Sequence, residues 1–190
     1  MAVELRRERL RREMTDEILA ATRLLLEKGS PSAVSARAIA RQLGVTAPAI
    51  YRYFPSMDAL MDALTESVVS ELCAALDSAR DSARDSACDR PGGIAAAFRG
   101  WVLDHPASFR LVLGLNGRPA GAQELIRRLP SASTLGSSTL GSSTLYWAAL
   151  CGLALLEIGG EQEGSPEDFS HLYAAAAGLS ALPATQHVRG

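Results

Sequence analysis

The sequence has no apolar run long enough to cross a bilayer, and it contains only three cysteines and three histidines. Its most apolar stretch, residues 145–160, falls short of the roughly 20 residues that a membrane-spanning helix needs. The cysteines, Cys73, Cys88 and Cys151, lack the spacing of a metal site or a redox pair. No apolar segment behind the N-terminal charges marks a secretory signal. We therefore expect a cytoplasmic protein with reduced thiols, no membrane partner, no metal and no cofactor.

Recognisable catalytic groups are also missing. His105, His171 and His187 are far apart in the chain, and no serine or cysteine lies in a nucleophile-elbow pattern. Most aspartates and glutamates fall at positions expected to be solvated. We expect no catalytic residues, and an enzyme is the weakest of the alternatives.

Positive charge is concentrated at the N-terminus. The chain has a net charge of -2, but residues 1–60 hold ten Lys/Arg against seven Asp/Glu, whereas residues 61–190 hold nine against fourteen. The first segment is therefore +3 and the second is -5. A basic head is steered toward a polyanion that an acidic body repels, so only the head is expected to meet nucleic acid. Chance scatter of charges is the alternative.

Apolar spacing predicts helices along the whole chain. The arginine-rich residues 4–12 lead without a breaker into an amphipathic helix that ends at Gly29. Residues 1–12 form either a basic arm that contacts DNA or a solvated extension of that helix. Ser35 is a plausible N-cap for a second helix over residues 36–43. A long fourth helix is expected to begin at Ser56.

Residues 35–54, SARAIARQLGVTAPAIYRYF, predict a helix-turn-helix. Two helices that cross steeply need a small residue at the contact, a flexible turn residue and a buried aliphatic residue, and Ala40, Gly44 and Ile50 supply these. Thr46 is expected to cap the second helix of the pair, with Pro48 tolerated in its first turn. That helix can then enter a DNA groove.

The remainder of the chain predicts a second, larger helical domain. Pro91, Gly92 and Gly93 are expected to end the fourth helix, and a further short helix is predicted at residues 123–129. The period-five run STLGSSTLGSSTL, residues 133–145, predicts a loop or a poorly formed helix. Apolar helices follow at 145–160 and 167–182. The predicted fold is all-α, with a three-helix DNA-binding head at residues 1–55 and a helical-bundle dimerisation and ligand domain at residues 56–190.

The head resembles the TetR family of bacterial transcriptional regulators through AIARQLG and the following GVTAPAIYRYFPSMDAL, residues 44–60. The body resembles a C-terminal domain common in actinobacterial members, through HPASFRLVLG at 105–114 and YWAALCGLALLEIGG at 146–160. There Trp147 is followed by Cys151-Gly152, where a His-Gly pair is usual. Two further departures from the family are Met57, which replaces a common phosphate-contacting lysine, and the STLGS run, which replaces a more regular helical stretch.

The resemblance implies a homodimer that binds palindromic operator DNA. It also implies dimerisation through the last two helices and a pocket for a small-molecule effector. The last helix carries a small-residue surface and the preceding one a set of large apolar residues, and the alternative is burial of both sets within one subunit. The two sets are Ala174, Ala175, Ala176, Ala177, Gly178 and Ala181 on the last helix, and Trp147, Leu150, Leu153 and Leu156 on the other.

Carried over by position, the DNA-contacting residues lie at the start of the second helix and along the third. Thr46 and the first N–H groups of its helix can hold a phosphate, and Tyr51 can donate its hydroxyl to another. Arg52 fits a guanine edge or a phosphate. For Tyr53 the alternative is packing beside Phe54. The full set is Ser35, Arg37, Thr46, Ala47, Pro48, Tyr51, Arg52 and Tyr53.

An effector pocket is expected to be apolar because the helices of the body carry few charges on their inner faces. Its predicted lining is Phe98, Trp101, Phe109, Leu113, Trp147 and Cys151, with ordinary core packing as the alternative. The function that follows is a dimeric repressor released from DNA by an apolar or amphipathic ligand. The alternative is an effector-independent regulator or an activator.

Overall fold

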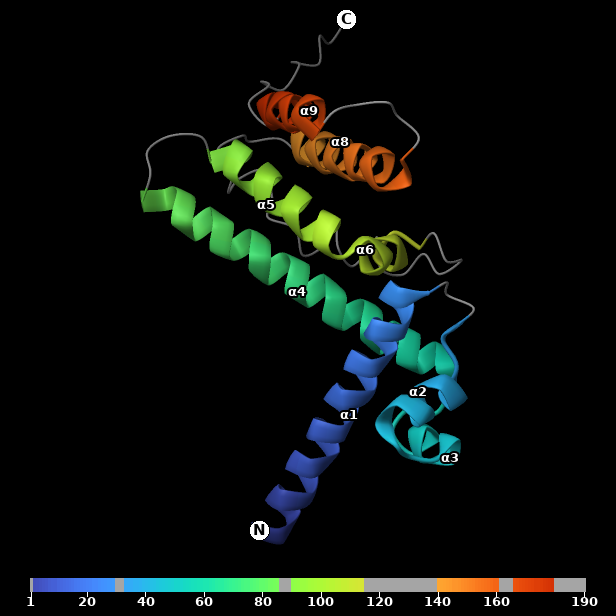
Figure 1. Cartoon of the computed structure of the whole chain (residues 1–190). Helices are drawn as coiled ribbons and strands as arrows, with labels where there is room; N and C mark the ends of the chain where they lie inside the picture. Colours follow the sequence, from blue (N-terminus) through green and yellow to red (C-terminus); the bar gives the residue numbers. More distant parts are fainter. Residues whose placement is uncertain (1, 30–32, 86–89, 115–139, 161–165, 180–190) are drawn as a thin grey trace, which may run out of the picture. The chain divides into compact units, whose positions relative to one another are not determined.

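The computed structural model describes residues 2–29, 33–85, 90–114, 140–160 and 166–179 (Figure 1). Within these ranges the chain forms helices and no strands, as predicted. It divides into two compact units. The N-terminal unit comprises residues 1–69 with 107–122, and the C-terminal unit comprises residues 70–106 with 123–190. The helix predicted at 123–129 and residues 133–139 of the repeat lie outside the described residues.

The N-terminal unit is built on α1 (Ala2–Lys28), α2 (Ala36–Leu43), α3 (Ala47–Tyr51) and the first part of α4 (Met57–Asp85). Helix α6 (Pro106–Val112) adds residues from Ala107 onward. One apolar cluster joins the first four helices. Its fully buried members are Ile18, Ala21, Ile39, Ala40, Ile50, Phe54 and Leu60.

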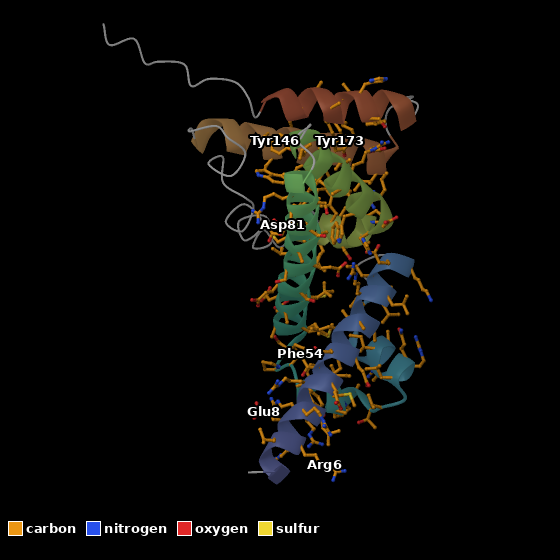
Figure 2. The ribbon with its side chains drawn as sticks, turned by 90° about the vertical axis from the view of Figure 1, so that its left-hand side faces the viewer. Arg6, Glu8, Phe54, Asp81, Tyr146 and Tyr173 are labelled. Atoms are coloured by element: carbon orange, nitrogen blue, oxygen red, sulfur yellow. The ribbon has the colours of Figure 1, made fainter. Side chains whose placement is uncertain are left out.

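Residues 2–12 are continuous with the rest of α1, which begins at Ala2. Leu5 is 68% exposed and Leu10 is 52% exposed, so residues 5–12 bury little apolar surface. Figure 2 shows Arg6 and Glu8 extending from this end of α1. The basic segment is therefore the helical extension and not a separate arm, since no residue in it breaks the helical hydrogen-bond pattern.

Helix α4 begins as the sequence predicts. The Oγ of Ser56 accepts a hydrogen bond from the backbone N–H of Ala59 at 3.1 Å, which satisfies one of the unpaired donors of the first turn. An apolar stripe, buried at Leu60, Leu64 and Val68, fixes the inward face of this helix. In its last turns Arg80 pairs with Asp77 at 3.0 Å. Asp77 is exposed and Arg80 is partly buried, so this near-surface pair contributes little to stability.

The C-terminal unit packs α5 (Arg90–Asp104) against both α8 (Leu140–Gly159) and α9 (Pro166–Leu179). Pro91, Gly92 and Gly93 lie in the first turn of α5, whereas the sequence placed them before it. Proline is tolerated there because first-turn N–H groups have no partner within the helix. Helix α8 begins five residues before the predicted start at Leu145. Once buried Tyr146 and Trp147 anchor the helix, each further turn costs little, even with weak helix formers.

One guanidinium joins α5, α8 and α9. Arg99 of α5 donates from Nε to both carboxylate oxygens of Glu157 in α8, each at 3.0 Å. It also donates from Nη1 to the Oγ of Ser170 in α9 at 2.6 Å. The same guanidinium lies 5.6 Å from the ring centroid of Tyr173, which Figure 2 labels on α9. The Glu157 carboxylate is the main cause of the raised pKa of Arg99.

Candidate nucleic-acid interface

The turn between α2 and α3 has the geometry that a helix-turn-helix requires. Ser35 has extended backbone angles, and its Oγ accepts from the N–H of Ala38 at 3.2 Å, which confirms it as the N-cap of α2. Gly44 ends α2 with φ +68°, a left-handed conformation that glycine adopts without a steric penalty. The N–H of Val45 donates to the carbonyl of Ala40 at 2.9 Å and closes the turn.

Thr46 occupies the N-cap position of α3, but its side chain forms no cap hydrogen bond. The predicted N-cap position is therefore confirmed, but the capping hydrogen bond is absent, and Pro48 supplies the reason. A capping hydroxyl accepts from the second or third N–H of a helix. The second residue is Pro48, which has no N–H, and the N–H of Ala49 donates to the backbone carbonyl of Thr46 at 2.9 Å instead.

Opposite faces of the α3 segment carry anchoring and exposed side chains. Ile50 and Phe54 are buried in the head cluster, whereas Tyr51 is 49% exposed and Arg52 is also exposed. Ser35, Arg37, Thr46 and Pro48 are exposed as well. The other two predicted contacts, Ala47 and Tyr53, are partly buried and pack against the head cluster.

Residues 18–64 match the sequence model of the bacterial regulatory proteins of the tetR family. This match contains α2, the Gly44 turn, α3 and the beginning of α4. This part of the chain is therefore similar to the head of the tetR-family regulatory proteins.

Solved structures extend the likeness to most of the chain. The regulatory protein SCO4313 is 25% identical, with a TM-score of 0.70 over 91% of this chain and 97% of that one. The multidrug binding protein EbrR, solved with imidazole, is 20% identical, with a TM-score of 0.70 over 90% of this chain and 97% of its own. PfmR from Thermus thermophilus, a TetR family transcriptional regulator, is 15% identical, with a TM-score of 0.57 over 89% and 99%. Because EbrR and PfmR are so distant in sequence, they show only that the fold is shared. No curated protein gives a significant match to the sequence.

Packing within the N-terminal unit accounts for the methionine at position 57. Met57 is partly buried against the apolar head cluster, where a lysine would have to keep its ammonium group in water. The replacement therefore adds apolar contact at the beginning of α4. Because methionine carries no charge, position 57 has no cation that could pair with a DNA phosphate.

The predicted pocket residues belong to both units. Phe98, Trp101, Trp147 and Cys151 lie in the C-terminal unit, whereas Phe109 and Leu113 lie in the N-terminal one. Phe98 and Trp147 meet edge to face with ring centroids 6.0 Å apart. Burial raises the pKa of the Cys151 thiol to about 11. Both observations are those expected of ordinary core packing.

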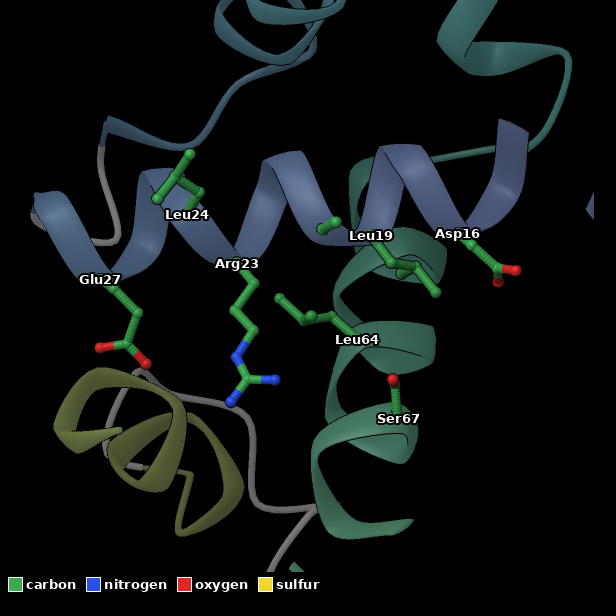
Figure 3. Close-up of a pocket in the computed structure, with 8 residues that line it drawn as sticks. Asp16, Leu19, Arg23, Leu24, Glu27, Leu64 and Ser67 are labelled. Atoms are coloured by element: carbon green, nitrogen blue, oxygen red, sulfur yellow. The ribbon is translucent and has the colours of Figure 1, made fainter. Parts of the chain in front are cut away.

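Two features of the N-terminal unit have no signal in the sequence pattern. Glu27 of α1 accepts from the backbone N–H groups of Ala107 and Ser108, at 3.1 and 3.0 Å, and so caps the start of α6. The two segments are about 80 residues apart in sequence, and no local motif links them. A cavity of about 500 Å³ also lies between α1 and α4 (Figure 3).

Among the described residues, no group of histidine, cysteine, aspartate or glutamate side chains could hold a metal ion. Of the helices in the described ranges, none is both long and apolar enough to span a membrane.

Proposed function

We propose that the protein is a dimeric transcriptional regulator that binds palindromic operator DNA through α3 and is released by a small apolar or amphipathic ligand. The observation that carries the proposal is the division of residues 47–54, which comprise α3 and the turn after it, into two faces. Ile50 and Phe54 anchor the segment in the head, while Tyr51 and Arg52 remain exposed. An exposed tyrosine beside an exposed arginine on such a helix suits contact with a groove and its phosphates.

The proposed DNA contacts divide into three kinds. Arg52 has the fork geometry to read a guanine edge or hold a phosphate. Ser35, Arg37, Tyr51 and Thr46 supply donors for phosphates, and the Thr46 hydroxyl is not used as a cap. Ala47 and Pro48 can offer only apolar contact, such as with a thymine methyl. Because Ala47 and Tyr53 also pack against the head cluster, their main role is to hold α3 in place.

The helical extension at residues 5–12 supplies further positive charge. All of these residues are exposed, and the five arginines among them outnumber the single glutamate. A solvated basic helix can contact phosphates beside the groove that α3 reads. Such contacts would compensate for the lysine missing at Met57.

The dimer is proposed to form through the faces of α8 and α9 that the C-terminal unit leaves open. Ala148, Gly152 and Leu156 recur every fourth residue on α8 and are all exposed. Leu172 and Ala175 are exposed on α9. This set replaces the one that the sequence suggested, because Trp147 and Leu150 are buried within the unit. Small and apolar residues on two neighbouring helices suit a four-helix contact between two subunits.

The effector is proposed to bind among the aromatic residues of the C-terminal unit near Phe98 and Trp147. Burial covers the indole N–H of Trp147 and the hydroxyl of Tyr173, and neither has a hydrogen-bond partner. Buried donors of this kind favour a ligand with a hydrogen-bond acceptor on an apolar body. The fold shared with EbrR, a multidrug binding protein, is consistent with a small organic effector.

A gel-shift assay with the intergenic DNA upstream of its own gene tests the proposal. The expected result is binding that prefers one palindromic site and weakens with salt. Thermal stability is then measured across a library of apolar and amphipathic compounds, and a hit should weaken DNA binding. DNA binding without any ligand effect would favour the effector-independent regulator. Absence of site preference would overturn the proposal.

A further inference from the structure

The cavity between α1 and α4 has the size of a small-molecule site. Its volume of about 500 Å³ falls within the roughly 300 to 1,000 Å³ typical of ligand pockets. Its lining comes from α1 between Asp16 and Glu27 and from Leu64 and Ser67 of α4. All of these residues belong to the N-terminal unit. None belongs to the proposed DNA contacts or to the proposed effector pocket.

Much of the cavity wall is apolar. Leu64 is 2% exposed and forms part of the buried stripe of α4, and Leu19 is half-buried against the head cluster. Ala20 is exposed, and its small side chain leaves space in the cavity for a ligand. Leu19 and Ala20 offer a surface for the apolar body of a ligand, and the buried Leu64 lies beneath it.

The lining offers two hydrogen-bond donors to an anion, the Arg23 guanidinium and the Ser67 hydroxyl. Figure 3 shows Arg23 reaching from α1 alongside Leu64, while the Ser67 hydroxyl points from α4 toward α1. Arg23 also takes part in another interaction, but a guanidinium carries five donors and can serve two acceptors. A carboxylate between Arg23 and Ser67 would receive hydrogen bonds from both.

The two acidic residues of the lining limit the ligand to a single negative charge. Both carboxylate oxygens of Glu27 accept hydrogen bonds from the start of α6, so this side chain is already committed. The exposed Asp16 carboxylate lies at the other end of the lining. A second carboxylate on the ligand would meet Asp16 and be repelled.

We propose that this cavity binds a small amphipathic monocarboxylate, with its carboxylate between Arg23 and Ser67 and its apolar body over Leu19, Ala20 and Leu64. Binding at this site does not depend on the proposed DNA-binding function. Its test uses the full chain without DNA, so that failure of one proposal leaves the other intact.

Isothermal titration calorimetry with three eight-carbon probes tests the ligand class. Sodium octanoate is expected to bind saturably with one site per chain. The dicarboxylate suberate and the cation octylammonium are expected to bind at least about tenfold more weakly. The second carboxylate of suberate is repelled by Asp16, and the ammonium group of octylammonium cannot pair with Arg23. Equal binding of all three probes would overturn the proposed selectivity.

Substitutions from opposite walls test the location. Ala20→Phe on α1 and Ser67→Leu on α4 each place a larger side chain in the cavity, and each should weaken octanoate binding about tenfold or more. Two variants are used so that a folding defect in one leaves the other as the test. Ala74→Phe, at an exposed position of α4 outside the lining, is the matched control and should bind octanoate normally. Wild-type binding by both filled variants would show that octanoate binds elsewhere.

Arg23→Gln tests the carboxylate contact itself. It should lower octanoate affinity about tenfold, which is the equivalent of one charge-assisted hydrogen bond. Neutral octanol serves as a fourth probe, and its affinity should be the same for Arg23→Gln and the wild type. Unchanged octanoate affinity in Arg23→Gln would overturn the proposed placement of the carboxylate.

Discussion

Glu27 holds Ser108 through two hydrogen bonds to one oxygen: Oε1 accepts from the Ser108 backbone N–H at 3.0 Å and from its hydroxyl at 2.6 Å. Ser108 is fully buried, so neither donor can turn to water if the carboxylate is removed. The contact fixes the start of α6 to the last turns of α1. It therefore stabilises the N-terminal unit directly.

Removal of this carboxylate should destabilise the protein. We expect Glu27→Ala to lower the free energy of unfolding by about 1–3 kcal/mol, because it leaves buried donors unsatisfied. Ser108→Ala should cost about 1 kcal/mol, and the double variant should cost less than the sum of the two. Urea denaturation measures all three. Glu17→Ala, at an exposed position of α1, should change stability by less than about 0.5 kcal/mol. Full additivity of the two substitutions would contradict direct coupling.

The turn glycine should tolerate alanine poorly for reasons of backbone conformation alone. A Cβ at Gly44 would meet nothing within 4 Å, but φ is +68°. Gly44→Ala should therefore cost about 1–2 kcal/mol. Gly100 of α5 also has open space around it and no positive φ, so Gly100→Ala should stabilise by up to about 1 kcal/mol. Thermal unfolding of Gly44→Ala and Gly100→Ala measures the two changes in stability. A loss of stability in both variants would contradict an effect of backbone conformation alone.

The Cys151 thiol should react slowly in the folded protein. Burial raises its pKa from 9.0 to about 11, so folding favours the protonated form. This contribution to stability is complete below pH 9 and is lost as the pH rises toward 11. At pH 9, iodoacetamide should modify Cys151 about 50-fold more slowly than in urea, because about 1% instead of half of the thiol is ionised. Peptide mass spectrometry measures the two rates, and equal rates would contradict burial of this side chain.

A large residue at Gly152 should block the proposed dimer without disturbing the subunit. A Cβ there would meet nothing within 4 Å in the subunit. Gly152→Arg is expected to elute as a species near the 20.1 kDa subunit mass in size-exclusion chromatography with light scattering, while the wild type elutes at twice that mass. Gly100→Arg, at another glycine with open space around its Cβ position, should remain dimeric. A dimeric Gly152→Arg would place the interface elsewhere.

Local signals in the sequence were sufficient to predict the head. Ser35 and Gly44 bracket α2, and the predicted range 36–43 matches the observed helix. Ser56 likewise begins α4 as predicted. In each case one side chain or one backbone conformation decides the boundary within a few residues. Such information is present in the sequence itself.

Features that depend on neighbours distant in sequence were predicted poorly. The earlier start of α8 depends on the buried residues that anchor the helix, and not on the weak formers in its first turn. The absence of a capping hydrogen bond at Thr46 has a local cause instead, because Pro48 lacks the N–H that a cap would use. The Glu27 contact with α6 joins segments that only the folded chain brings together.

The central claim is that the exposed face of α3 reads DNA, and fluorescence anisotropy with the upstream intergenic duplex tests it most directly. Arg52→Ala should weaken binding by about 1–3 kcal/mol and either relax base preference or reduce the salt slope by about one unit. Arg80→Ala removes the same charge from the C-terminal unit and should bind as the wild type does. Wild-type affinity, base preference and salt dependence in both Arg52→Ala and Tyr51→Phe would contradict the account.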